Sequence, residues 1–465
     1  MGLHLGLLLL YAALQVGIGL LIGRRVSTSA DFFVARRSLG PGLLFATMVA
    51  ANVGAGSTVG AAGLGYRDGL AAWWWVGSAA VGSLVLAFTV GPRMRSIAAE
   101  NGLSTVGDFL EHRYGREVRG VIALLLWLGT LAILAGQLIA LAWVLNVVAG
   151  LPKWAGCVLG GAVATAYFTA GGLLTSAFVN VLQLVVMVAG FGIALPLVVA
   201  RAGGIGGMVA ATASLRDFWN PWQGGASGIA YLAFLGPAFV VSPGLLQKVY
   251  GARDDRTVRL GVGGNAVVLF AFAFVPPLFG MAARVLHPTL ANHELALPTV
   301  LMADLPPLLG ALGLLAVVSA EISTADAILF MLATSLSQDL YRRFVRPAAT
   351  DAQVLKVARA AAILGGTAGA LLAILAPTVI DLLSLFYTVL SVSLFVPVMA
   401  GLYARRVGTP EVAAAIAFGC LTLVAVRLAG GASFLGLTPA ALGLLASAAA
   451  CVLVFAARRI RPQTS

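Results

Sequence analysis

Apolar stretches of about 20 residues, each long enough to cross a bilayer as a helix, follow one another along almost the whole chain. They constrain the fold more than any other feature of the sequence. Of the 465 residues only 10% are charged, whereas a soluble domain carries about 25%. Backbone polar groups in lipid must be satisfied within the segment itself, which favours helices. The sequence therefore predicts an all-α polytopic membrane protein with no soluble domain of about 100 residues.

A hydropathy window of about 19 residues predicts thirteen transmembrane helices. The first is predicted to be retained rather than cleaved as a signal peptide, because it has no basic n-region and Arg24–Arg25 follow it. The predicted spans are 3–22, 41–66, 70–91, 118–148, 154–170, 175–200, 227–248, 258–284, 306–336, 354–376, 379–403, 410–428 and 438–457.

Basic residues distribute unevenly over the loops between these spans. With thirteen spans, 23 of the 29 Lys and Arg residues fall on one side and six on the other. The positive-inside rule then places the N-terminus outside and the C-terminus inside the cytoplasmic membrane. The net charge of +12 is thus a topology signal with lipid headgroup contact, and it does not indicate nucleic-acid binding. The three cysteines stand singly, without a CxxC pair, which argues against a disulfide framework or a zinc site.

Two spans contain helix-breaking residues near their middle. The second span carries Gly54 and Gly56 beside Ser57 and Thr58, and the seventh carries Gly236-Pro237 and Ser242-Pro243-Gly244. Irregular backbone at membrane depth occurs where it lines a cavity or is packed in protein. Two interrupted spans five apart are typical of an inverted-repeat transporter whose site lies where the breaks meet. The alternative is that the glycines only permit close helix packing and that the prolines only kink their helix.

The segment 319-SAEISTADAILF-330 places polar side chains in an otherwise apolar span. Ala320, Ser323 and Thr324 share one helix face. Hydroxyls and carbonyls freed at a helix break are hard oxygen ligands, which suit a hard cation. Asp326 points to nearly the same side, and Glu321 lies elsewhere on the helix without an assigned role. An interhelical hydrogen-bond cluster is the alternative, but it is worth only about 0.6 kcal/mol per contact, against at least about 2.5 kcal/mol for a buried charge.

These segments together resemble the sodium:solute symporter family, over nearly the whole chain. No single motif is decisive, but their order and spacing are specific. The matching segments are 31-DFFVARRSLG-40, 50-AANVGAGSTVGAAGLGY-66, 107-GDFLEHRYG-115, 171-GGLLTSAFVNVLQ-183, 322-ISTADAILFMLATSLSQDLYRRF-344 and 385-LFYTVLSVSLFVPVMAGLYARR-406.

The resemblance implies a leucine-transporter-type fold in a single transmembrane domain. An extra N-terminal helix and loop (1–40) would precede a five-plus-five inverted repeat (41–200 and 227–403), and two further helices (404–465) would follow it. It also implies a sodium site made by the carbonyls of Ala50, Val53 and Ala320 and the hydroxyls of Ser323 and Thr324. Where many members have an aspartate, this chain has Asn180. We expect Asp326 to supply the charge of a second cation site, with Asn180 as a neutral ligand.

The implied activity is sodium-coupled uptake of a small organic solute by alternating access, with sodium as the co-transported ion. No nucleophile–base arrangement or metal motif indicates an enzyme, and no protein partner is implied. Proton coupling within the same fold and a membrane-embedded solute sensor remain open as alternatives. Family positions near the solute correspond to Asn52, Ser57, Trp74, Gln137, Phe239, Ser242, Phe386 and Tyr387. An interfacial aromatic belt and core packing are alternative explanations for the aromatic members.

Overall fold

The computed structural model describes residues 2–23, 39–222, 228–429 and 438–460, without the side chains of Tyr167, residues 170–178 and a few helix-end residues. Most of the 31–40 motif, and the side chains that begin the 171–183 motif, therefore lie outside the described part. The described residues form helices and their connections, apart from one backbone bridge between Leu39 and Ala252.

The helices follow the predicted apolar segments closely. Up to residue 211 they are α1 (Gly2–Gly23), α3 (Pro41–Asn52), η2 (Ala55–Ser57), α4 (Val59–Asp68), η3 (Gly69–Ala72), α5 (Trp73–Val85), η4 (Leu86–Val90), α6 (Gly91–Glu100), α7 (Val106–Tyr114), α8 (Arg116–Ala149), α9 (Lys153–Arg201) and α10 (Gly204–Ala211). From residue 229 they are η5 (Ile229–Tyr231), α11 (Leu232–Val241), α12 (Pro243–Tyr250), α13 (Asp255–Phe272), α14 (Val275–Leu286), η6 (His293–Leu295), α15 (Ala296–Ala303), α16 (Pro307–Thr334), η7 (Ser335–Val345), α17 (Asp351–Leu375), α18 (Val379–Tyr403), α19 (Thr409–Leu428) and α20 (Pro439–Ile460).

Among the described residues, ten helical stretches are long and apolar enough to cross a membrane, and Gly2–Ile18 and Pro41–Asn52 are shorter apolar helices. The prediction of an all-α polytopic membrane protein is confirmed. The spans predicted at 154–170 and 175–200 form one helical element, α9, of 49 residues. At 1.5 Å per residue this length is about 74 Å, more than twice the roughly 30 Å of hydrocarbon. The two parts of α9 have different neighbours, since Gly156 lies against Ala142 of α8 and Gly190 against Ala316 of α16.

Both predicted helix breaks are present. α3 ends at Asn52, after which Val53 and Gly54 have extended backbone before η2 and α4. α11 ends at Val241, and Ser242 is non-helical before Pro243 opens α12. Pro237, by contrast, lies inside α11. A third interruption, between α13 and α14, was not predicted, and it coincides with Pro276 and Pro277 in the first turn of α14, where missing N–H groups prevent a continuous helix.

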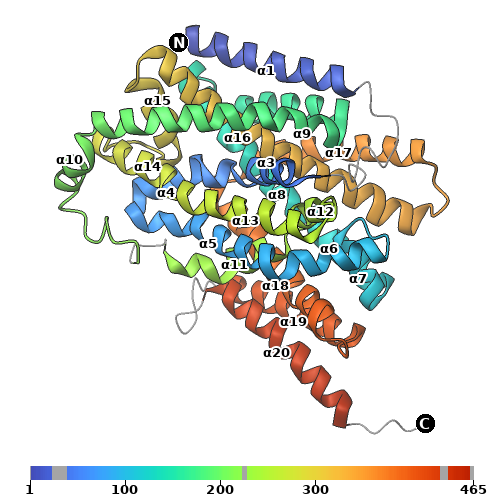
Figure 1. Ribbon diagram of the computed structural model, residues 1–465. Coiled ribbons are helices and arrows are strands. Elements are labelled where there is room, and N and C mark those ends of the chain that lie inside the picture. Colours follow the sequence, from blue (N-terminus) through green and yellow to red (C-terminus); the bar gives the residue numbers. More distant parts are fainter. Residues whose placement is uncertain (1, 24–38, 223–227, 430–437, 461–465) are drawn as a thin grey trace.

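The helix α16 lies at the centre of the packing and is buried along most of its length. It contacts α1, α3, α8, α9, α15 and α17. In Figure 1, α1 runs along one edge of the molecule, and α19 and α20 lie at the opposite edge. The two broken helices and α16 thus meet inside a shell of membrane helices.

Candidate functional site

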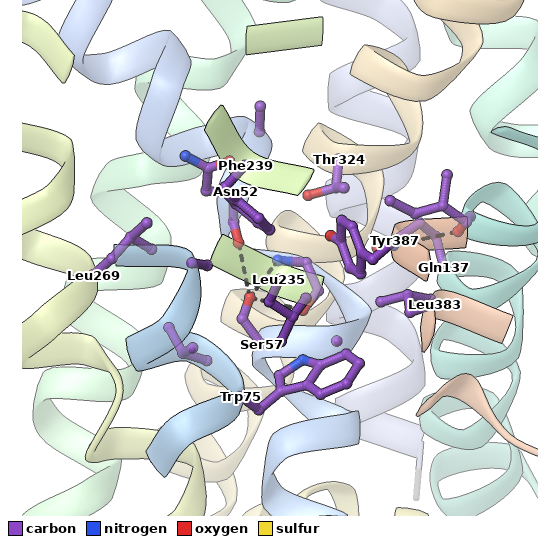
Figure 2. Close-up of a pocket in the computed structure, with 16 residues that line it drawn as sticks. Asn52, Ser57, Trp75, Gln137, Leu235, Phe239, Leu269, Thr324, Leu383 and Tyr387 are labelled. Carbon is purple, nitrogen blue, oxygen red and sulfur yellow. Dashed lines mark hydrogen bonds between the residues drawn. The ribbon is translucent and has the colours of Figure 1, made fainter. Parts of the chain in front are cut away.

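The break between α3 and α4 frees backbone carbonyls by diverting their helical partners. In a continuous helix the carbonyl of Ala50 would accept from Gly54 N, and that of Val53 from Ser57 N. Instead, Gly54 N donates to Ser57 Oγ at 2.9 Å, and Ser57 N donates to Gly54 O at 3.0 Å. Ser57 therefore stabilises the non-helical backbone of the break through hydrogen bonds of its hydroxyl with Gly54 N and Asn52 O, which Figure 2 shows.

The freed carbonyls face the hydroxyls of α16. Ser323 Oγ lies 2.9 Å from Ala50 O and 3.0 Å from Ala320 O. Thr324 Oγ1 lies 3.3 Å from Ala50 O and 3.1 Å from Val53 O. All five groups expected at the sodium site therefore lie together, although they belong to segments about 270 residues apart. Each hydroxyl has one proton and two lone pairs, so turning its proton away from the carbonyls lets five oxygens face a single hard cation.

Glu321, which had no role in the sequence, has a partner in the structure. Its side chain is fully buried, and Oε1 lies 2.6 Å from Thr58 Oγ1 at the start of α4. Thr58 Oγ1 is also 2.9 Å from Gly54 O. The contact thus joins α16 to the start of α4, directly after the break.

The two residues expected at a second cation site are both buried. Asp326 of α16 has no exposed surface, and Asn180 of α9 is 5% exposed. The two helices pack against each other. Among the described residues, Asn180 Oδ1 has no hydrogen-bond donor. A buried amide oxygen of this kind has the capacity to accept from, or to coordinate, a further group.

A cavity of about 30 Å³ adjoins the break, and Figure 2 shows its walls. Five of the eight expected solute-contacting residues line it, namely Asn52, Ser57, Gln137, Phe239 and Tyr387. Thr324 lines it as well, so one residue belongs both to the cation-facing group and to the cavity wall. A buried water needs roughly 10–15 Å³, so in the described conformation this space has room for a few waters at most.

Three expected solute-contacting residues lie elsewhere. Trp74 packs against Trp73 and Trp222, and the neighbouring Trp75 lines the cavity instead. Phe386 is buried against Tyr387, and Ser242 forms the break before α12 without reaching the cavity wall. In a run of three tryptophans, successive side chains point about 100° apart around a helix, so the sequence alone does not identify which one faces inward.

The cavity wall is aromatic and uncharged. The Trp75 ring centroid lies 6.3 Å from that of Tyr387, which lies 5.4 Å from that of Phe239. No Asp, Glu, Lys or Arg occurs among its described lining residues. Behind the wall, Asn52 Nδ2 donates to Asn265 Oδ1 at 3.1 Å. Asn265 is a fully buried residue of α13, and its amide within an apolar span was the one sequence signal for it.

Helix α4 is covered in part by η6. A Cβ on Gly63 would lie 2.9 Å from the His293 ring, so this glycine allows the close approach. The next residue, Glu294, is fully buried and accepts from Trp143 Nε1 at 2.9 Å and from Val379 N at 2.7 Å. Burial raises the pKa of Glu294 above its ordinary value. The loop thereby connects α4, α8 and the start of α18.

Several curated transporters are similar to this chain in sequence. The chain is 27% identical to the sodium/pantothenate symporter of Escherichia coli over 95% of this chain and 93% of the relative. It is 25% identical to the sodium/glucose cotransporter of Vibrio parahaemolyticus, covering 76% and 71%, and 25% identical to the high-affinity choline transporter 1 of Drosophila melanogaster, covering 93% and 71%.

Solved structures show the same fold. A sodium-coupled sialic acid symporter in its outward-open state aligns with a TM-score of 0.84 at 18% identity, covering 98% of this chain and 97% of the other. A nucleobase-cation-symport-1 family transporter aligns with a TM-score of 0.59 at 16% identity, covering 92% and 94%. The predicted leucine-transporter-type fold is confirmed, and the relatives are transporters rather than enzymes. The family model for sodium:solute symporters matches residues 32–419, and the chain belongs to the sodium:solute symporter family.

Proposed function

We propose that this protein is a sodium-coupled symporter that carries a small organic solute into the cell by alternating access. The observation that carries the proposal is the double role of Thr324, whose hydroxyl meets the carbonyl of Val53 at 3.1 Å while the residue also lines the cavity. A sodium ion held there would order the wall against which the solute binds. By linkage, the solute would tighten sodium binding by the same factor.

We expect the halves of the broken helices next to the breaks to move during transport. Lys248 Nζ of α12 donates to Thr47 O of α3 at 2.5 Å, so the first half of one broken helix is tied to the second half of the other. We expect these halves to move together against α8 and α16. Sodium bound between Ala50, Val53 and Ser323 opposes that separation, and its release permits it. At a membrane potential of about 100 mV each sodium contributes about 2.3 kcal/mol, enough for about fiftyfold solute accumulation.

The remaining expectations belong to the same proposal. Asp326 and Asn180 would form a second cation site, the repeats would span 41–200 and 227–403, and the N-terminus would lie outside the cytoplasmic membrane. The uncharged aromatic wall favours a solute that needs no charged side chain for recognition. The relatives named above carry glucose, pantothenate, choline and sialic acid in their names, and these four solutes form a first panel.

A thermal-shift screen of the purified protein tests the proposal. We expect one of the panel solutes to stabilise the protein in sodium chloride and not in potassium chloride, because a ligand stabilises only the state that binds it. Ser323→Ala should abolish the sodium-dependent shift. Ser337→Ala is the matched control, because among the described residues that hydroxyl bonds to Ala333 O, one turn earlier in the chain, at 2.6 Å and away from the break.

Uptake into proteoliposomes separates the alternatives. Uptake driven by a sodium gradient at equal pH supports sodium coupling. Uptake driven by a pH gradient in potassium, with no response to sodium, would establish proton coupling instead. Solute binding without any uptake would favour the sensor.

A further inference from the structure

The N-terminal helix α1 presents a single inward stripe to the rest of the molecule. His4, Leu8, Tyr11 and Gln15 recur at the spacing of one helix face, and each is at most 7% exposed. The opposite face is open, with Leu9, Leu10 and Leu14 at least 50% exposed. In a helix whose outer surface faces lipid, polar residues confined to the inner stripe must serve a contact with neighbouring helices.

Hydrogen bonds of Ser319 to Tyr11 and to Leu315 O form the contact with α16. Tyr11 OH lies 2.6 Å from Ser319 Oγ, and Ser319 Oγ donates to Leu315 O at 2.7 Å. A serine hydroxyl has one proton. That proton can point to Leu315 O or to Tyr11 OH, so either hydroxyl can be the donor in the bond between Tyr11 and Ser319. Ser319 is fully buried and Tyr11 is 7% exposed, so this bond is shielded from solvent.

Ser319 stands directly beside the proposed sodium site. It precedes Ala320, whose carbonyl lies 3.0 Å from Ser323 Oγ, and it is one helical turn before Ser323 itself. Positions i and i+4 lie on one helix face. Tyr11 therefore contacts the same face of α16 that meets the α3 break at Ser323, one helical turn earlier.

The two helices also run in the same direction. His4 lies beside Gly310, 3.4 Å from where its Cβ would be, and Tyr11 contacts Ser319 further along both helices. A parallel arrangement agrees with the predicted topology, in which both helices start on the outer side. The contact therefore extends along the first half of α16 at least from Gly310 to Ser319, which precedes Ala320.

We propose that Tyr11 is a positioning residue for sodium binding: the extra N-terminal helix fixes the face of α16 so that Ala320, Ser323 and Thr324 point at the break before the ion arrives. This rests on the proposed sodium site. Without the Tyr11 bond, α16 can adopt more orientations in the sodium-free state, and ordering it opposes binding. Losing this one hydrogen bond removes its contribution to preorganising the site. We expect sodium affinity to fall about two- to tenfold as a result.

Sodium titrations followed by thermal shift in detergent, with potassium keeping the ionic strength constant, test the proposal on the full chain. Tyr11→Phe should raise the half-saturating sodium concentration about two- to tenfold. Ser319→Ala should do the same, and the double variant should be no worse than either single variant, because both remove one bond. If Tyr11→Phe fails to fold, Ser319→Ala tests the same bond from the other side.

Tyr66→Phe is the matched control. Tyr66 is 5% exposed, and its hydroxyl donates to His287 O at 2.9 Å at the end of α4 away from the break. We expect this variant to lose thermal stability in potassium while its half-saturating sodium concentration stays within twofold of the wild type.

Three results would overturn the proposal. Sodium half-saturation in Tyr11→Phe and Ser319→Ala equal to that of the wild type removes the positioning role and leaves the symporter function standing. If Tyr66→Phe raises the half-saturating sodium concentration as much as Tyr11→Phe does, the loss of any buried tyrosine hydrogen bond has the same effect. A wild-type protein without any sodium-dependent shift defeats the sodium site itself.

Discussion

Replacing Gly54 by alanine should disable sodium binding while leaving the membrane helices folded. Gly54 lies in the break between α3 and η2, and its backbone is extended, so alanine can adopt its dihedral angles. The difficulty is space, because an added Cβ would lie 2.4 Å from Thr324 Oγ1 and 2.7 Å from Gln137 Oε1. One methyl group would therefore press on the cation-facing hydroxyl and on the amide that accepts from Ala55 N.

The size of the effect follows from these distances. Ordinary van der Waals contact begins at 3.4 Å. The segment around Gly54 must therefore move by about 1 Å away from α16, a large shift for a close-packed interior. Thr324 Oγ1 and Val53 O are now 3.1 Å apart, and the same movement takes them to about 4 Å, beyond hydrogen-bond distance. Overpacking of this kind costs about 1–3 kcal/mol, which corresponds to about five- to 150-fold weaker sodium binding.

Thermal shift against sodium concentration measures this directly. Gly42→Ala is the matched control, since nothing lies within 4 Å of its added Cβ at the start of the same helix α3. We expect wild-type sodium half-saturation in Gly42→Ala and at least a fivefold increase in Gly54→Ala. Half-saturation in Gly54→Ala within twofold of the wild type would refute the proposed contact between the break and Thr324.

Three further predictions concern buried carboxyl groups. Burial raises the pKa of Glu294 above its unfolded value of about 4.5. The stability that this carboxyl contributes is therefore fully present below pH 4.5 and is lost as pH rises through the folded pKa. The thermal midpoint of the wild type should fall more steeply over this pH range than that of Glu294→Gln, and parallel curves would contradict this. Glu321→Ala should lower the thermal midpoint by the equivalent of about 0.5–1.5 kcal/mol, because the hydrogen bond between α16 and the start of α4 is lost while Thr58 keeps the carbonyl of Gly54, whereas Glu321→Gln keeps an acceptor oxygen and most of the stability; equal losses would show that the bond has no role. Asp326→Asn should reduce the number of sodium ions moved per solute in proteoliposomes, and an unchanged ratio would remove the second cation site.

The sequence was sufficient for the membrane architecture because hydropathy acts locally. Each predicted span overlaps a helix, since a run of about 20 apolar residues has one stable conformation in lipid whatever its neighbours are. Both broken helices were also predicted, because Gly, Pro and Ser at membrane depth weaken a helix by their own chemistry. The interruption at Pro276 and Pro277 was missed because a hydropathy window averages over two residues.

Some side chains of the site could be predicted from local sequence, and others could not. Helical spacing placed Ser323 and Thr324 on one face without any knowledge of the fold. Which tryptophan faces the cavity depends on the rotation of α5 against α11, and no local pattern encodes that rotation. Trp75 lines the wall while Trp74 packs against Trp222, and only packing between distant segments distinguishes the two.

What the sequence by itself determined is where the apolar helices lie, two of their breaks and the oxygen-bearing face of one of them. Only the tertiary structure decided what that face meets: the carbonyls of Ala50 and Val53, the contact of Glu321 with Thr58, and the hydrogen bond between Tyr11 and Ser319. The physical reason is that helix formation in lipid satisfies each segment's own backbone. A contact between helices depends instead on the rotation and depth of two segments at once, and those are fixed by the packing of the whole bundle.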